Sequence, residues 1–449
     1  MAVINSISRT PLQKNIFYAN ISTIFIQKNF FMIKMSRIVS SAVIGNALEF
    51  YDLAVYGFFT SVISKNFFPQ QDKLAGIAST FGIFLIGYLA RPLGALFFGR
   101  VGDTLGRKSA LIMSMWLMAF GSFSIGLLPN YYAIGVWAPI LLVVLRMLQG
   151  FSFGGEYCGS IIFVLEHAPR TRRGFYGSIT DAGQNLGYLL SALIIWLLNI
   201  GLSNEALVKW GWRLPFLLGS VLGIVGWFIR RNIGEAQLFR ETYRVPDTFF
   251  DFYREYIKHM RHTLLIVVMS LFPSVLAYLI YVFIITYMSN ILDYTLQQAL
   301  IINILSIIIL VLSEPLMGTL SDHIGRRPVM IFGLISCVLW SWPYFWLLQQ
   351  NNFTLALLAQ GIMTLFAAAY FAGVVVSMVE IVPIYLRFSV VAFAYAVALS
   401  IFGGMTPLVS TLLIKGTHSY VGLVLCLLMA ALISAIAVYK LRETKPVPE

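Results

Sequence analysis

Hydrophobic residues in this chain are gathered into long runs separated by short polar gaps. A helix that crosses a membrane needs about 20 predominantly apolar residues, and the runs are close to that length. They lie near 38–64, 74–98, 109–128, 134–164, 174–199, 212–230, 263–289, 297–320, 328–348, 353–379, 388–413 and 418–439. Several contain Gly or Pro, which membrane helices tolerate. The pattern predicts an all-α integral membrane protein with twelve transmembrane helices.

The longest polar stretch, 231–262, divides the predicted helices six and six. The pattern Gly-x3-Asp-x2-Gly-Arg-Lys/Arg occupies 99–108 and recurs at 318–327, and Glu-x2-Pro-x3-Arg occupies 166–173 and recurs at 380–387. Two repeats at similar offsets indicate two pseudo-symmetric six-helix bundles. Many transporters are built from such repeats, with the substrate between them.

The repeats define the expected domains. We expect an N-terminal bundle over 35–230, a cytoplasmic linker over 231–262, a C-terminal bundle over 263–440 and a cytoplasmic tail over 441–449. Residues 1–34 contain neither a clean span nor a small-residue cleavage site. Because Met35 begins a stretch that reads like a natural start, we expect 1–34 to be a poorly ordered or spurious extension.

Charge supports this picture. Only 11% of the 449 residues are charged, against 59% hydrophobic, whereas soluble domains are about 25% charged. Most of the 31 Lys and Arg residues lie in alternate gaps and in the two tails. The positive-inside rule then predicts a multi-pass protein of the cell inner membrane with both termini in the cytoplasm. Topology explains the net charge of +12 better than binding to nucleic acid.

Several classes of function lack their sequence signatures. The three cysteines, Cys158, Cys337 and Cys426, form no CxxC pair, so neither a disulfide framework nor a zinc site is expected. The chain has no P-loop, HExxH or GxSxG motif. ATP-driven pumping, common membrane hydrolysis, metals and cofactors are therefore not expected.

The repeated Gly-x3-Asp loop resembles the signature loop of the major facilitator superfamily, and Arg146-Met-Leu-Gln149-Gly150 resembles its second motif. Other motifs resemble the metabolite:proton symporter family, which includes proline/betaine, 2-oxoglutarate, citrate and shikimate carriers. These motifs are Gly45-Asn46-Ala-Leu-Glu49-Phe-Tyr-Asp52, Tyr56-Gly57, Arg91-Pro92-Leu-Gly94, Gly154-Gly155-Glu156-Tyr157, Glu166-His-Ala-Pro169 and Phe402-Gly403-Gly404-Met-Thr-Pro407. Phe50 stands where members usually carry Trp.

Acidic residues inside predicted spans are functional candidates, because an unpaired charge there costs on the order of several kcal/mol. Glu49 and Asp52 share one helix face with Asn46 and Tyr56. Mutual repulsion and loss of water favour the protonated form of at least one acid. We expect one of them to carry a proton. The alternative is a position near the water boundary or a pair with a neighbouring arginine.

Two interior arginines are candidates for holding a carboxylate. Arg146 shares a face of the fourth span with Gln149, Phe153 and Glu156, and it keeps its charge throughout. It either binds substrate, moves between acids, or forms a permanent ion pair. Arg91, in the second span, is a second interior cation or a helix anchor.

The fifth span carries Asp181, Gln184, Asn185 and Tyr188 on one face. These side chains either line a cavity or join helices by hydrogen bonds, which are worth about 0.6 kcal/mol each. With Glu49, Asp52 and Glu156, Asp181 completes the set of expected proton-coupling acids.

The C-terminal half contains one acid that is plainly inside a span, Glu314, and many tyrosines, including Tyr281 and Tyr370. Tyrosines around a cavity can hold a quaternary ammonium group by cation–π contact; otherwise they pack the bundle. We therefore expect proton movement in the N-terminal half and mainly substrate contacts here. The candidate substrate-binding residues are Arg91, Arg146, Gln149, Gln184, Asn185, Tyr281 and Tyr370.

The repeated loops are interpreted as gates. Their glycines permit close helix approach, and their acids can interact with a nearby helix N-terminus or with an arginine across the bundle. The gating candidates are Gly99, Asp103, Arg107, Glu166 and Arg173 in the first half, and Gly318, Asp322, Arg326, Glu380 and Arg387 in the second.

The resemblance implies the major facilitator fold and proton-coupled import, by alternating access, of a small carboxylate-bearing metabolite or osmolyte such as proline or glycine betaine. A dicarboxylate, tricarboxylate or shikimate-type symporter, and an uncoupled uniporter or exchanger, remain open, as does a non-transporting sensor or enzyme. We expect a monomer whose partners are the substrate, protons and membrane lipid.

Overall fold

A computed structural model describes residues 11–68, 73–105, 107–231, 254, 257–384 and 387–443. Within these ranges, side chains are described except at 11–34, 73, 99–100, 102–111, 156, 222, 226 and 229–231. All regular elements of the described residues are helical. Long apolar stretches form helices in a membrane because each backbone N–H and C=O must find its partner within the segment.

Six spans make up the first half. They comprise α1 (Pro11–Phe58) with α2 (Thr60–Phe67), α3 (Lys73–Leu89) with α4 (Arg91–Leu105), α5 (Arg107–Leu127), α7 (Trp137–Ser152) with α8 (Glu156–His167), α9 (Arg173–Gly201), and α11 (Arg213–Arg231). The short helices α6 (Tyr131–Ile134) and α10 (Asn204–Ala206) lie in the connections.

Six more spans make up the second half. They comprise α14 (Met260–Ala277) with η4 (Tyr278–Phe283) and α15 (Ile284–Asn290), α16 (Leu296–Ile324), α17 (Arg326–Leu348), α18 (Phe353–Glu380), α19 (Arg387–Ala398) with η6 (Leu399–Gly403) and α20 (Gly404–Thr417), and α21 (Val421–Lys440). Both η4 and η6 are π-helical turns, a local irregularity that is frequent at functional sites.

The predicted all-α membrane fold is confirmed. Ten helices of the described residues are long and apolar enough to cross a membrane. Two shorter apolar helices, Ile112–Leu127 and Arg213–Val225, occupy the third and sixth positions and complete twelve.

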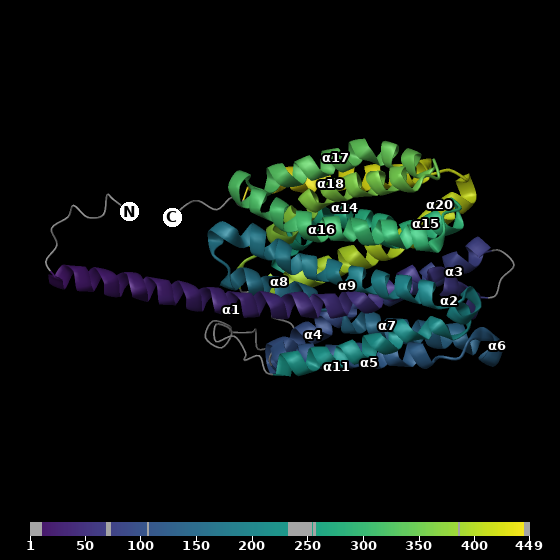
Figure 1. The fold of residues 1–449 in the computed structure, drawn as a ribbon, viewed down its shortest axis with the longest axis horizontal. Coiled ribbons are helices and arrows are strands. Elements are labelled where there is room, and N and C mark those ends of the chain that lie inside the picture. The colour runs from purple at the N-terminus through teal and green to yellow at the C-terminus, as the bar shows by residue number, and fades with distance from the viewer. Residues whose placement is uncertain are drawn as a thin grey trace.

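The first helix begins before the predicted bundle. Residues 11–34 continue α1 as helix, and Figure 1 shows this helix projecting beyond the bundle; that 1–34 is a poorly ordered or spurious extension stays a prediction. Residues 1–10, and 232–253 of the proposed linker, lie outside the described residues. The domain boundaries stay a prediction.

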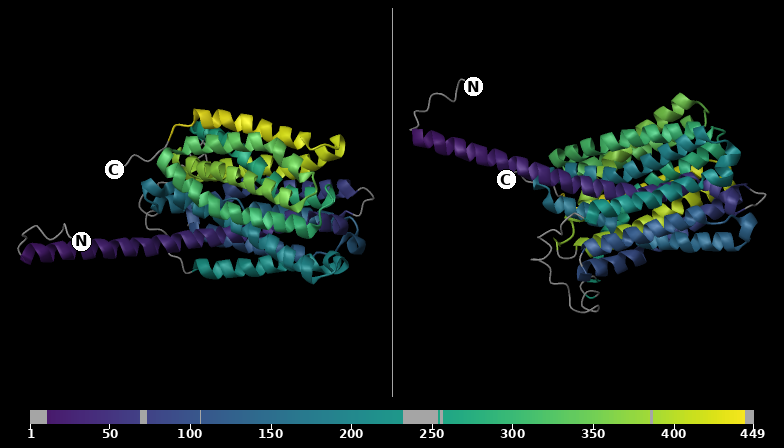
Figure 2. Two further views of the ribbon diagram at one scale, coloured as in Figure 1. Left: turned by 45° about the horizontal axis from the view of Figure 1, so that its top comes forward. Right: turned by 60° about the horizontal axis from the view of Figure 1, so that its bottom comes forward.

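The two halves lie side by side with their helices roughly aligned (Figures 1 and 2). Across the interface, α9 packs along α16, α3 packs against α20, and α1 contacts η4. Two glycines lie where α9 and α16 approach closely, because a Cβ atom built on Gly174 would lie 2.2 Å from the backbone oxygen of Gly318. Larger residues here would separate α9 from α16.

Candidate functional site

A central cavity lies between the halves, with about 550 Å³ of space that includes its opening to solvent. Its polar wall is α9, which contributes Asp181, Gln184, Asn185 and Tyr188. Aromatic and apolar side chains form the remaining walls: Phe50, Tyr157, Pro273, Ala277, Tyr278, Tyr281, Phe371, Val374, Val375, Met378, Tyr395 and Leu399, joined by Ser274. The predicted face of the fifth span thus lines a cavity, and the π-helical turns η4 and η6 supply part of the opposite wall.

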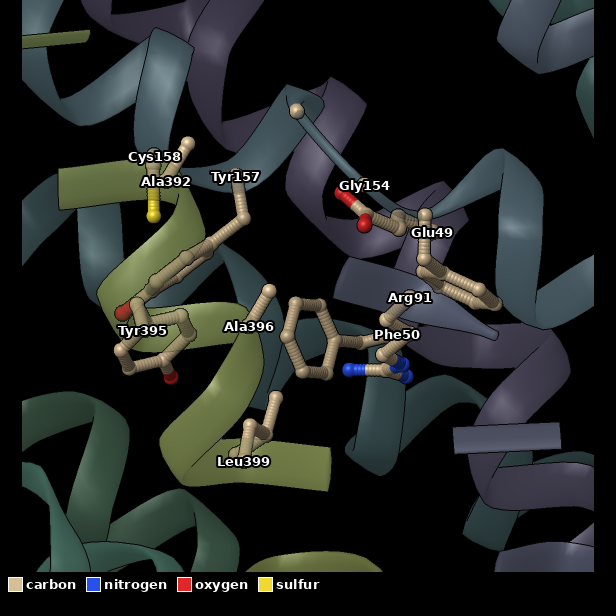
Figure 3. A pocket seen from close by; sticks show the side chains of 12 residues that line it. Glu49, Phe50, Arg91, Gly154, Tyr157, Cys158, Ala392, Tyr395, Ala396 and Leu399 are labelled. Atoms are coloured by element: carbon tan, nitrogen blue, oxygen red, sulfur yellow. The ribbon is translucent and has the colours of Figure 1, made fainter. Parts of the chain in front are cut away.

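A smaller neighbouring cavity of about 320 Å³ lies beside it, and the two share Phe50, Tyr157, Tyr395 and Leu399 in their walls. Its charged residues are Glu49 from α1 and Arg91 from α4. Figure 3 shows Arg91 and Phe50 on one side of this space and the two tyrosines on the other.

Arg91 is held by aromatic rings. Its guanidinium carbon lies 3.8 Å from the ring centroid of Tyr88 and 4.5 Å from that of Phe153. The side chain is buried, and its Nε and Nη2 make no hydrogen bond to any described residue. A guanidinium carries five N–H donors and binds a carboxylate as a fork. Arg91 therefore offers unused donors beside the cavities.

Arg146 is engaged elsewhere. It stacks on Tyr56 at 4.2 Å, and its Nη1 donates to Oε1 of Gln149 at 2.8 Å. Gln149 Nε2 donates to Ser122 Oγ at 2.8 Å, and Ser122 Oγ donates to the Asp52 carboxylate. This chain of hydrogen bonds lies within the first half, and neither Arg146 nor Gln149 lines the two cavities.

The four polar residues of the first span reach different neighbours. Asn46 donates to the backbone oxygen of Thr180 at 3.0 Å, and the Tyr56 hydroxyl donates to that of Thr80 at 3.1 Å. Glu49 faces the smaller cavity, whereas Asp52 turns toward Ser122. Spacing placed them on one helix, but they do not form one cluster.

The acids Asp181 and Glu314 meet between the halves. Asp181 Oδ1 accepts from the Tyr157 hydroxyl and from Gln184 Nε2, the latter at 2.7 Å. Glu314 Oε2 accepts from Asn185 Nδ2 at 2.8 Å. Asn185 is one helical turn after Asp181 on α9, so this hydrogen bond places Glu314 beside the helix face that carries Asp181. Sequence reasoning treated Glu314 as isolated in its half.

Contacts between the halves also close the end at which α9 begins. The carboxylate of Asp322 accepts from the backbone N–H groups of Gly174 and Phe175 at 2.8 and 3.0 Å, where the helix dipole favours a negative charge. Asp322 also pairs with Arg326, 2.6 Å from Nη1 to Oδ1. At the opposite end of the cavity, Asn290 Nδ2 donates to Ser61 Oγ at 2.8 Å.

Further ion pairs surround the contacts of Asp322 with the start of α9. Glu380 lies 3.5 Å from Arg326 and 3.9 Å from Arg173, and Glu166 lies 3.7 Å from Arg387. The Arg173 and Arg387 pairs join one half to the other.

Glu443, just past α21, accepts from the backbone N–H groups of Arg326 and Arg327 at 2.8 and 3.1 Å. The end of the described chain thus caps the start of α17.

Some candidates fall elsewhere. Tyr370 does not line either cavity, because its hydroxyl donates to the backbone oxygen of Met269. The side chains of Glu156, Asp103 and Arg107, and the surroundings of Gly99, lie outside what the structure describes.

Sequence reasoning did not single out the aromatic wall formed by Phe50, Tyr157 and Tyr395. Tyr157 follows Glu156 directly and Phe50 follows Glu49 directly, so proximity to candidate acids was the available signal.

Comparisons with known proteins agree with this architecture. Residues 38–239 match the family described as "Sugar (and other) transporter", and residues 304–449 match "Major Facilitator Superfamily". The chain is similar in structure to the xylose transporter XylE of E. coli in a partially occluded inward-open conformation, with a TM-score of 0.74, 18% identity, and coverage of 92% of this chain and 99% of the other.

Several known transporters are more similar to this chain in sequence than the xylose transporter is. The proline/betaine transporter of Salmonella typhimurium is 33% identical over 92% of this chain and 84% of its own length. The glycine betaine/proline/ectoine/pipecolic acid transporter of Dickeya dadantii is 31% identical over 92% and 85%. The chain therefore belongs to the major facilitator superfamily, within its metabolite:proton symporter family, and is a multi-pass membrane transporter.

Proposed function

We propose that this transporter imports a small zwitterion, carrying one carboxylate and one cationic nitrogen in the manner of proline or glycine betaine, together with a proton. The observation that carries the proposal is Arg91, whose buried Nε and Nη2 make no hydrogen bond to any described residue. They lie beside cavities with aromatic walls and one acidic wall. The names of the similar transporters support the same class of substrate.

The two cavities suit the two ends of such a substrate. A carboxylate binds Arg91 through paired N–H donors. The cationic nitrogen lies against the aromatic wall, where the rings of Tyr157 and Tyr395 stack 4.9 Å apart and attract cations. Asp181 supplies a compensating negative charge, and Gln184 and Asn185 supply polar contacts. Tyr281 lines the same cavity, and we assign it a substrate contact.

A carrier of di- or tricarboxylates is less consistent with this geometry. Such a substrate requires several cations, and Arg91 is the only Lys or Arg in the described lining of the two cavities. Arg146, the second arginine proposed from the sequence, donates to Gln149 instead. We assign to Arg146 and Gln149 the role of stabilising the Asp52 carboxylate.

We further propose that a buried acid of the first half carries the proton: Glu49, Asp52, Glu156 or Asp181. No cofactor and no chemical conversion of the substrate are required. The protein acts as a monomer in the inner membrane, in contact with lipid and not with nucleic acid.

Both termini are proposed to be cytoplasmic. A cysteine placed at 415 is then labelled by an impermeant reagent in intact cells and one at 240 is not. The reverse pattern excludes this topology.

Alternating access requires a gate, and we assign that role to the contacts around Asp322. Asp322→Asn weakens two hydrogen bonds to α9 and the pair with Arg326, so substrate exchange slows while the protein level is maintained. Asp293→Asn, on an exposed residue of an outer connection, is the matched control. Normal exchange by Asp322→Asn removes the gating role; Asp103→Asn tests the equivalent role of the first loop.

Uptake by proteoliposomes tests the function. An imposed gradient, acid outside, is expected to drive accumulation of proline or glycine betaine, but not of 2-oxoglutarate, citrate or shikimate. Arg91→Gln is expected to weaken binding at least about tenfold, since hydrogen bonds to a charged group contribute about 1.5–3 kcal/mol. Arg213→Lys, outside both cavities, is the control. Accumulation of citrate in place of zwitterions, or unchanged binding by Arg91→Gln, contradicts the proposal.

A further inference from the structure

Asp181 and Glu314 form an acid pair between the two halves of the molecule. Asp181 is on α9 of the first half and Glu314 is on α16 of the second, and both side chains are almost completely buried. These helices pack along one another and approach closely at Gly174 and Gly318. A contact at this position depends directly on how the halves are arranged.

A direct hydrogen bond between the two acids requires a proton, because an ionised carboxylate only accepts hydrogen bonds. Asn185, one helical turn after Asp181 on α9, donates to Oε2 of Glu314, which places Glu314 beside the helix face that carries Asp181. Oε1 of Glu314 is buried and receives no hydrogen bond from a described N–H or hydroxyl group. One proton shared by the two carboxyl groups gives this oxygen a partner.

Neighbouring charges do not offer another solution. The ionisable groups that interact with Asp181 are Tyr157 and Cys158 on α8 and Tyr395 on α19, and Tyr281 on η4 interacts with Glu314. No Lys or Arg in the described ranges forms an ion pair with either acid. Two buried like charges without a cation are strongly unfavourable.

We propose that Asp181 and Glu314 together bind the coupling proton, which bridges the halves when the substrate is enclosed. Asp181 also lines the central cavity, so a protonated pair presents one negative charge to one cationic substrate group. Loss of the proton leaves two facing carboxylates, whose repulsion separates α9 from α16. The pair therefore links proton release to opening. This inference rests on the proposed proton symport and assigns its proton to a site that includes the second half.

Amide variants mimic the protonated pair. In Glu314→Gln and Asp181→Asn the new amide donates permanently to the remaining carboxylate. We expect both variants to lose accumulation driven by the pH gradient, and Glu314→Gln, which leaves the cavity lining unaltered, to retain exchange of labelled for unlabelled glycine betaine. Glu205→Gln, an exposed acid in an outer connection, should behave like the unaltered protein.

Binding measured against pH separates this role from a structural one. In the unaltered protein the apparent Kd for glycine betaine rises by up to about tenfold per pH unit once the pair loses its proton, as expected for one linked proton. In both amide variants the Kd should no longer depend on pH. Variants with unchanged pH dependence, or that still accumulate substrate, overturn the inference.

The outcomes distinguish the two proposals. If the unaltered protein ignores the pH gradient, proton symport itself is wrong. If it is driven by the gradient and the amide variants are driven equally well, symport stands and the acid pair is wrong. Should the amide variants not fold, Asp181→Glu combined with Glu314→Asp keeps both acids. Retained accumulation in this swapped protein supports the pair, and loss from a folded swapped protein overturns it.

Discussion

Asp52 and Asp181 are both buried aspartates of the first half, but they have opposite kinds of surroundings. Asp52 is connected to Arg146 through Ser122 and Gln149, all within its own half. Asp181 lies at the interface, one helical turn before the Asn185 that donates to Glu314, and no described cation pairs with either acid. When the halves move as rigid bodies, Asp52 keeps its partners and Asp181 loses one. Burial alone therefore does not identify a coupling acid; the position of its partner does.

The largest loss of stability is expected when Arg146, the cation connected to Asp52 by hydrogen bonds, is replaced. Arg146→Gln leaves Asp52 buried without its compensating charge, and breaking such an arrangement costs about 3 kcal/mol of unfolding free energy. Thermal unfolding in detergent measures this loss. Asp181→Asn keeps a hydrogen bond to Glu314, so a loss below about 1 kcal/mol is expected.

The double variant Asp52→Asn with Arg146→Gln supplies the control for that prediction. Residues of one network are not additive, so it should be more stable than the summed single losses indicate. Equal destabilisation by Asp181→Asn and Arg146→Gln contradicts the comparison.

Much of this contrast could not be read from the sequence. Apolar runs predicted the helices, because the thickness of a membrane sets their length, and the repeated loops predicted two bundles. Helical spacing also placed Asp181, Gln184 and Asn185 on one face. Spacing within a helix does not reveal which neighbour a side chain meets, so Glu49 and Asp52 were grouped although they point apart. Glu314 was considered isolated because its partner is 133 residues away and the packing of α9 on α16 decides the contact.

A smaller loss of stability is expected from a substitution that displaces only the Asp52 carboxylate. A Cβ atom built on Gly219 would lie 2.0 Å from Asp52 Oδ1, so Gly219→Ala displaces the carboxylate. Overpacking of this kind costs about 1–3 kcal/mol. Because Asp181 and Glu314 are not contacted, the pH dependence of glycine betaine binding should persist.

Gly82→Ala is the matched control, since nothing lies within 4 Å of its new Cβ atom. Loss of pH dependence in folded Gly219→Ala protein places the proton at Asp52 instead.

The smallest effect is expected at a single donor to the acid pair. Tyr157→Phe removes the hydroxyl that donates to Asp181 and keeps the ring that stacks on Tyr395. One such hydrogen bond contributes about 1 kcal/mol, so accumulation driven by the pH gradient should fall about fivefold. Tyr370→Phe, whose hydroxyl bonds away from the cavity, should leave transport unchanged. Equal losses in both variants indicate a packing effect and not a role in the pair.

The contact of Glu443 with the start of α17 has a consequence for biosynthesis. Chains emerge from the ribosome from the N-terminus onward, and Glu443 follows α21. The backbone N–H groups of Arg326 and Arg327 therefore lack the Glu443 carboxylate as hydrogen-bond acceptor until more than a hundred further residues have been synthesised. The face that carries Asp322, Arg326 and Glu380 is completed only when that residue arrives, so a nascent chain stalled within α21 lacks a finished second half.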